Sequence, residues 1–210
     1  MHTNNQGLGS ALLGAIVALA LLVTPTVAID TTNVAFVQTH AGTTSIPIGH
    51  AEFCQSRPDE CRPNAQIVPS IALTETLWQQ LLHVNAQVNA TVVPVTDQDL
   101  YQVTEFWTYP NGYGDCEDYV LAKRRELINA GWPASTLLIA VVKQANGEGH
   151  AVLMARTDRG DLVLDNQVGS IDLWSATPYQ FIKRQSQANA GQWVDMIDNR
   201  EVVVATAGIN

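Results

Sequence analysis

The sequence predicts a fold that combines helices with antiparallel hairpins in one domain spanning residues 29–210. Apolar side chains recur near helical spacing from Tyr119 to Ala130, and charged residues occupy the other face. Three β-prone runs follow at Leu137–Lys143, Ala151–Arg156 and Asp161–Leu164, separated by a flexible connector and a tight turn. We therefore expect a central helix followed by two successive hairpins.

Turn and cap residues mark both ends of the central helix. Gly131 and Pro133 end it, and Gly114 and Asp115 lie just before it. Upstream, an apolar stripe predicts a second helix over Ser70–Asn89. We also expect an extended or irregular link over Ala90–Leu100, a helix over Ser175–Ala188 and a last strand over Glu201–Thr206.

Cys116 falls in the first turn of the central helix. Unpaired N–H groups and the positive end of the helix dipole are found there, and both lower the pKa of a thiol. The same N–H groups suit the oxyanion of a tetrahedral intermediate. A cysteine buried as a small apolar side chain is the alternative, and Cys116 alone does not decide between the two.

His150 and Asp165 are placed to meet. His150 begins the second strand of the hairpins and Asp165 ends the third, and antiparallel neighbours set the start of one strand beside the end of the next. An acid on one ring nitrogen leaves the other nitrogen for Cys116. Thiol, imidazole and carboxylate are the three groups that a cysteine hydrolase needs. A strand-edge histidine and a turn aspartate are the alternative roles.

The first 28 residues have the outline of a secretory signal peptide. They contain no Lys, Arg, Asp or Glu, and an apolar run extends from Ala11 to Val23. Small residues at Thr26–Ala28 suit a cleavage site. An uncleaved anchor is the alternative, although the run is shorter than the roughly 20 residues that span a bilayer.

Charge and cysteine usage fit an exported protein. The net charge of -9 and the lack of a basic run argue against nucleic acid as a partner. In an oxidising compartment, Cys54 and Cys61 are expected to form a disulfide, which leaves Cys116 as the free thiol. Metal binding by this pair is the rival, with His50 as the nearby histidine.

The stretches GDCEDYVLAKRRELINAGWP and GEGHAVLMARTDRGDLVLDN resemble the bacterial transglutaminase-like cysteine proteinases, whose best-known members are LapG-type periplasmic proteases. The resemblance runs from about Ile46 to Gln187 and is densest from Gly114 to Asn166. It implies an α+β, papain/transglutaminase-like core with the nucleophile helix packed on an antiparallel sheet.

The resemblance also implies the site and its partners. The family nucleophile, base and orienting acid fall on Cys116, His150 and Asp165. The implied activity is cleavage of a large cell-surface adhesin in the periplasm, which controls biofilm attachment. A cyclic-di-GMP-responsive receptor of the inner membrane is an implied partner. Family members keep a tryptophan upstream of the GDCED motif, for which Trp107 is the candidate here, although most aromatic residues pack in cores.

The acidic residues that flank Cys116 suggest a bound cation. Uncompensated carboxylates raise the pKa of a thiol, and closely spaced oxygen ligands suit calcium. The resemblance implies Ca²⁺ with Asp115 and Glu117 as ligands, and Asp118 is a weaker candidate. From the residues alone, Asp97 and Asp99 also lie within reach of a cation. Simple stabilisation of the helix N-terminus is the alternative role of these acids.

We therefore interpret the sequence as a periplasmic, calcium-dependent cysteine endopeptidase. Two other readings stay open. One is a transglutaminase-like acyl transferase or amidase that uses the same triad, since the triad does not select the second nucleophile. The other is a non-catalytic binding module in which Cys116 is inert.

Overall fold

The computed structural model describes residues 1–2 and 35–200. The predicted signal peptide over residues 1–28 and the strand expected at Glu201–Thr206 lie outside these residues, apart from the first two. No helix in the described ranges is long and apolar enough to cross a membrane.

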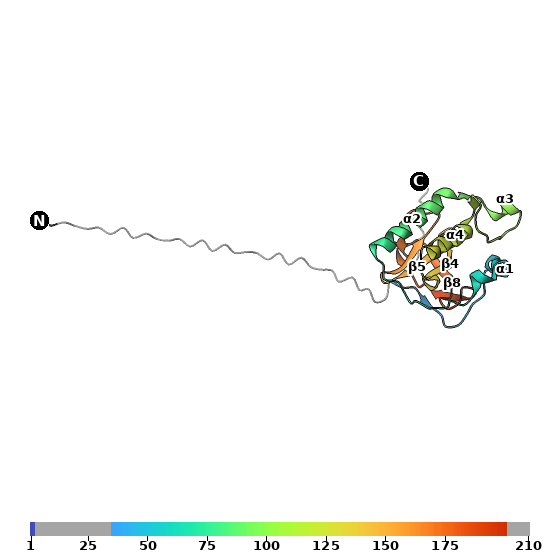
Figure 1. Ribbon diagram of the computed structural model, residues 1–210, viewed down its shortest axis with the longest axis horizontal. Helices are drawn as coiled ribbons and strands as arrows, with labels where there is room; N and C mark the ends of the chain where they lie inside the picture. The colour runs from blue at the N-terminus through green and yellow to red at the C-terminus, as the bar shows by residue number, and fades with distance from the viewer. Residues whose placement is uncertain (3–34, 201–210) are drawn as a thin grey trace, which may run out of the picture.

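Helices and an antiparallel sheet make up the domain, which confirms the predicted α+β class (Figure 1). The α-helices are α1 (Ile48–Ser56), α2 (Glu75–Thr91), α3 (Asp97–Tyr101) and α4 (Cys116–Asn129). Short 3₁₀ turns are η1 (Pro58–Cys61), η2 (Ala134–Thr136) and η3 (Trp174–Ala176). The strands are β1 (Gln38–Thr39), β2 (Val93–Pro94), β3 (Tyr113–Gly114), β4 (Leu137–Lys143), β5 (Gly149–Thr157), β6 (Gly160–Leu164), β7 (Asp172–Leu173), β8 (Gln180–Gln185) and β9 (Trp193–Ile197).

The main sheet has the strand order β1-β9-β8-β4-β5-β6-β7, and all its pairs are antiparallel. The hairpins predicted from the three β-prone runs are its centre: β4 pairs with β5, and β5 pairs with β6. A parallel pair of β2 and β3 lies apart from this sheet and leads into α4.

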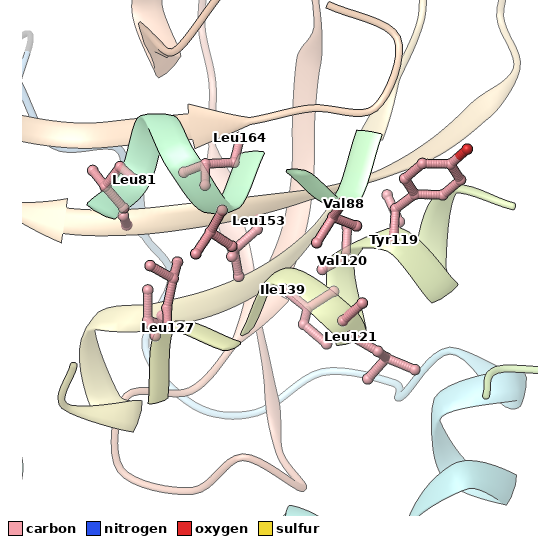
Figure 2. Close-up of a cluster of buried hydrophobic side chains, with 14 of the residues drawn as sticks. Leu81, Val88, Tyr119, Val120, Leu121, Leu127, Ile139, Leu153 and Leu164 are labelled. Atoms are coloured by element: carbon pink, nitrogen blue, oxygen red, sulfur yellow. The ribbon is translucent and has the colours of Figure 1, made fainter. Parts of the chain in front are cut away.

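Both faces of the central strands are buried, because successive side chains of a strand point to opposite faces. One face packs against α2 and α4, which lie side by side over the sheet (Figure 1). Figure 2 shows the apolar side chains of this layer, with Leu81 and Val88 from α2, Leu127 from α4 and Leu153 from β5. A second cluster, with Val152 and Phe181, fills the opposite face. The unbroken apolar run of β4 reflects this burial on two sides.

Two predicted elements differ from the structure. The helix expected over Ser175–Ala188 is wrong: η3 and then strand β8 occupy that segment. β8 pairs with β4 on one side and β9 on the other, so tertiary pairing overrides the helix propensity of its Gln, Lys and Arg residues. The link over Ala90–Leu100 is extended at β2, as expected, but its last residues enter helix α3 at Asp97, which the sequence did not predict.

Candidate active site

Cys116 is the first residue of α4, as the sequence predicted, and it is the free cysteine. Gly114, the last residue of β3, lets Asp118 pack closely against the backbone. A Cβ added there would come within 2.5 Å of the Asp118 carboxylate, so only glycine fits. Asp118 in turn accepts a hydrogen bond from the Thr108 N–H at 2.9 Å. Contacts of Asp118 with Gly114 and with the Thr108 backbone therefore hold the start of α4, and with it Cys116, in place.

His150 and Asp165 meet on neighbouring strands. The register pairs Leu153 with Leu164, which brings the start of β5 beside the end of β6. The His150 Nε2 and the Asp165 Oδ1 lie 2.9 Å apart, and both residues are buried. Because Asp165 accepts from Nε2, the Nδ1 is the ring nitrogen left for chemistry.

Two further residues hold the Asp165 carboxylate. The Tyr179 hydroxyl donates to its Oδ2, and the Gln167 backbone N–H donates to its Oδ1 at 2.9 Å. The Tyr179 ring also packs against His150, with ring centroids 5.5 Å apart. Burial alone raises the pKa of Asp165, but the hydrogen bonds from His150, Tyr179 and Gln167 outweigh it, so the pKa is lowered.

Sequence reasoning missed Tyr179 as part of the site. The segment that contains it was expected to be helical, and a tyrosine far downstream carries no local signal. Gln167 has a weak signal, because it follows the LDN motif directly. Its side-chain amide also lies 3.4 Å from the His150 Nδ1.

Cys116 and His150 lie beside the same empty space. Both residues line a cavity of about 470 Å³ and a second cavity of about 250 Å³. Within residues 35–200, the Cys116 sulfur has no hydrogen bond to His150, and it donates instead to the Glu117 Oε2 at 3.1 Å. Burial, and then the charge of Glu117, raises the pKa of Cys116 well above its ordinary value, although the Ala151 N–H acts in the opposite direction.

The acids predicted as metal ligands lie together. Carboxylate oxygens of Asp115 and Glu117 fall within 4.8 Å of each other and of Asp97, which arrives from the start of α3. Asp99 turns away and accepts a hydrogen bond from Thr96 at 2.9 Å. Of the two further acids that the sequence placed within reach of a cation, Asp97 thus joins the predicted pair and Asp99 does not.

This acidic cluster of Asp97, Asp115 and Glu117, with Asp118 beside it, has unsatisfied oxygens. Among the described residues, the Oδ1 of Asp97, the Oδ1 of Asp115 and the Oδ2 of Asp118 are buried without a hydrogen-bond partner. Burial raises the pKa of Asp97 to about 6 and that of Asp118 to about 7, and it raises the pKa of Glu117 as well. Such a set of oxygens fits a divalent cation, whose charge would offset their repulsion.

The remaining cysteines form a disulfide in the structure. Cys54 and Cys61 join α1 to η1, with their Cα atoms 5.6 Å apart. His50 lies against them and accepts a hydrogen bond from the Trp193 indole at 3.1 Å. Burial lowers the pKa of His50 to about 4, which keeps the ring neutral. Because both sulfurs are used in the disulfide, this group does not offer a zinc site.

Trp107 has a structural role and also borders the site. It is buried against His50 and Trp193, with its ring 5.3 Å from that of His50. The edge of the larger cavity is formed by the same residue, together with Pro47 and the exposed Ile48.

Comparison with known proteins identifies the family. The sequence model described as bacterial transglutaminase-like cysteine proteinase BTLCP matches residues 40–201. No curated protein matches the chain.

Among solved structures, the chain is similar to Legionella pneumophila LapG in three forms. The calcium-bound form is 26% identical, with 51% of this chain and 64% of that chain covered and a TM-score of 0.47. A further LapG structure is 26% identical, with 56% and 68% covered and a TM-score of 0.48. The EGTA-treated form is 24% identical, with 60% and 69% covered and a TM-score of 0.48. The match thus spans just under two thirds of the calcium-bound LapG chain.

The family match covers most of the chain, and the helix-on-sheet core agrees with a papain/transglutaminase-like fold. This protein belongs to the bacterial transglutaminase-like cysteine proteinases.

Proposed function

We propose that Cys116, His150 and Asp165 form the catalytic triad of a cysteine endopeptidase. The observation that carries the proposal is the buried His150–Asp165 hydrogen bond beside two cavities that Cys116 also lines. Covalent catalysis requires a nucleophile and a base that a third group orients. Here the thiol lies at a helix N-terminus, and the acid holds one ring nitrogen of the histidine.

The chemistry follows from these positions. The Cys116 sulfur attacks the scissile carbonyl, and amides at the N-terminus of α4 stabilise the oxyanion. His150 accepts the thiol proton at Nδ1 and returns it to the leaving amine, while Asp165 holds Nε2. A water molecule then attacks the thioester as His150 takes its proton. Cleavage of the C–S bond releases the carboxylic acid product, and His150 returns the proton to the Cys116 thiolate. Before attack, the sulfur exchanges its bond to Glu117 for a position facing His150, by rotation about the Cα–Cβ bond.

Replacement of the nucleophile tests the triad. Cys116→Ala should abolish peptide cleavage and leave the thermal unfolding temperature unchanged, because the side chain is half-buried and small. His150→Gln should lose activity while it keeps the free thiol. Appreciable proteolysis by Cys116→Ala would refute the proposal. Incorporation of an added amine into the product would instead favour acyl transfer by the same residues.

We propose calcium as the ion of the acidic cluster. Asp115, Glu117 and Asp97 would hold it, with backbone oxygens or water completing the 6–8 oxygen ligands that calcium takes. When bound, the ion supplies positive charge beside the nucleophile. The orphaned carboxylate oxygens support this assignment, because each is buried without a partner within the described part of the chain.

The calcium proposal has a test that does not depend on activity. Calcium should raise the unfolding temperature of the wild-type protein over that in EGTA, because a ligand that binds only the folded state stabilises it. Asp97→Asn should reduce this increment. Asp99→Asn is the matched control, since Asp99 lies on the same short helix but outside the cluster. An equal response to calcium in all three proteins would contradict the assignment.

The substrate and location are proposed on the family resemblance. Residues 1–28 would direct export, and the domain at 29–210 would act in the periplasm on a large surface adhesin that controls biofilm attachment. An inner-membrane receptor responsive to cyclic-di-GMP would restrain it. Two observations check this: the exported protein should begin at Ile29, and loss of the gene should leave the adhesin uncleaved at the cell surface.

A further inference from the structure

The two cavities beside Cys116 share only three lining residues. These are Cys116, His150 and Gly149. The larger cavity extends toward Pro47 and Ile48, and the smaller one extends toward Asn166 and Gln167. Gly149 therefore lies on the boundary between the cavities, next to the proposed nucleophile and base, and it has no assigned role so far.

The fold gives no reason for glycine at this position. Gly149 is exposed, and an added Cβ would meet nothing within 4 Å. Its φ is outside the left-handed region, so a side chain would cause no backbone strain. Gly114 is the contrast, because a Cβ there would collide with Asp118. Open space alone does not set Gly149 apart, because Gly169 is equally open, but Gly149 lies where the two cavities meet.

The direction of a side chain at position 149 follows from the strand. Residues two apart in a strand point to the same face, so a Cβ at Gly149 would project with that of Ala151. Ala151 belongs to the apolar layer on the α4 side of the sheet, against which Cys116 packs. A larger residue at 149 would hence project into the space that the two cavities share, with its Cβ more than 4 Å from the Cys116 sulfur.

One edge of β5 is also free at this end. β4 pairs with β5 as far as Gly149, but pairing with β6 begins only at Leu153. Residues 149–152 thus have no strand partner on their second edge among the described residues. The Ala151 N–H faces the Cys116 sulfur from that edge. Because alternate residues direct their backbone groups to the same edge, the N–H and C=O of Gly149 also face the cleft.

We infer that an extended segment of the polypeptide substrate crosses the molecule at Gly149, with its backbone against this free edge and its two flanking parts in the two cavities. Addition of a strand to an open sheet edge is a general mode of peptide recognition. The absence of a side chain at Gly149 lets the substrate backbone approach the sulfur. The inference rests on the proposed peptidase function and names the path of its substrate.

The test compares substitutions at two exposed glycines. Gly149→Val should lower kcat/KM for a pooled library of unstructured peptides by about 100-fold, because displacing a substrate by about an ångström has an effect of this size. Gly149→Ala should give an intermediate loss. Gly169→Val is the matched control, since Gly169 is also exposed, lies outside the left-handed region and has nothing within 4 Å of its added Cβ. It lines neither cavity, so its activity should equal that of the wild type.

Alkylation of Cys116 by iodoacetamide separates the outcomes. The small reagent does not need the substrate path, so Gly149→Val should alkylate at the wild-type rate and unfold at the wild-type temperature. Peptide cleavage by Gly149→Val at the wild-type rate would overturn the inference. Parallel loss of alkylation would also overturn it, because the side chain would then disable the thiol itself. A wild-type protein that alkylates but cleaves no peptide would refute the proposed function instead.

Discussion

Removal of one hydroxyl group tests how the proposed triad is held. Tyr179→Phe keeps the ring that packs against His150 and deletes the group that donates to the Asp165 Oδ2. A hydrogen bond to a charged group contributes about 1.5–3 kcal/mol. If that loss appears fully in the transition state, kcat falls by about 10- to 150-fold, because each 1.36 kcal/mol is a factor of ten.

The pH dependence of the variant has a definite sign. The pKa of Asp165 is lowered, and the Tyr179 hydroxyl is one of the hydrogen-bond donors that lower it. Without this donor the pKa of Asp165 rises, so the carboxylate becomes protonated at a higher pH. The acid limb of the activity profile should therefore move to higher pH, while KM changes little. The assay is steady-state cleavage of one peptide across the acidic range.

A second tyrosine provides the control. The Tyr119 hydroxyl is also buried and donates to the Val92 carbonyl at 2.6 Å, away from Asp165. Tyr119→Phe should reduce stability but leave the acid limb in place. If Tyr179→Phe keeps the wild-type kcat and pH profile, or if both variants shift the profile equally, Tyr179 does not position the triad.

Three further predictions concern stability. Gly114→Ala should destabilise the domain by about 1–3 kcal/mol in chemical denaturation, because the new methyl group overlaps Asp118; an unchanged midpoint would contradict the packing described. Burial lowers the pKa of Lys123 to about 7, so the unfolded chain binds more protons between pH 7 and 10.5, and wild-type stability should rise with pH across that window. Lys123→Met keeps the side-chain volume and should remove this rise in unfolding free energy with pH. A similar slope in both proteins would show that Lys123 is not its source. Replacing Cys54 and Cys61 by Ala should cost about 2–3 kcal/mol of unfolding free energy for a loop of this length, and equal stability of the two proteins would argue against the disulfide.

Local patterns determined much of the fold around the site. The helical period after Cys116 placed the thiol in the first turn of α4, and turn residues marked both ends of the central hairpins. Antiparallel geometry then predicted that His150 and Asp165 would meet, because the two residues belong to strands joined by a tight turn. These features depend on residues close together in the chain, where spacing and turn chemistry carry the information.

Contacts between distant segments were decided only by the tertiary structure. Asp97 joins Asp115 and Glu117 from another helix, and Tyr179 reaches Asp165 from a segment whose pattern predicted a helix. The strand order, which inserts β4 between β8 and β5, does not follow from the period of any one segment. The sequence alone thus determined which chemical groups are present and their local geometry. Packing of the sheet against α2 and α4 decided which distant side chains contact the groups of the site. The reason is that burial energy depends on the whole core rather than on any one element.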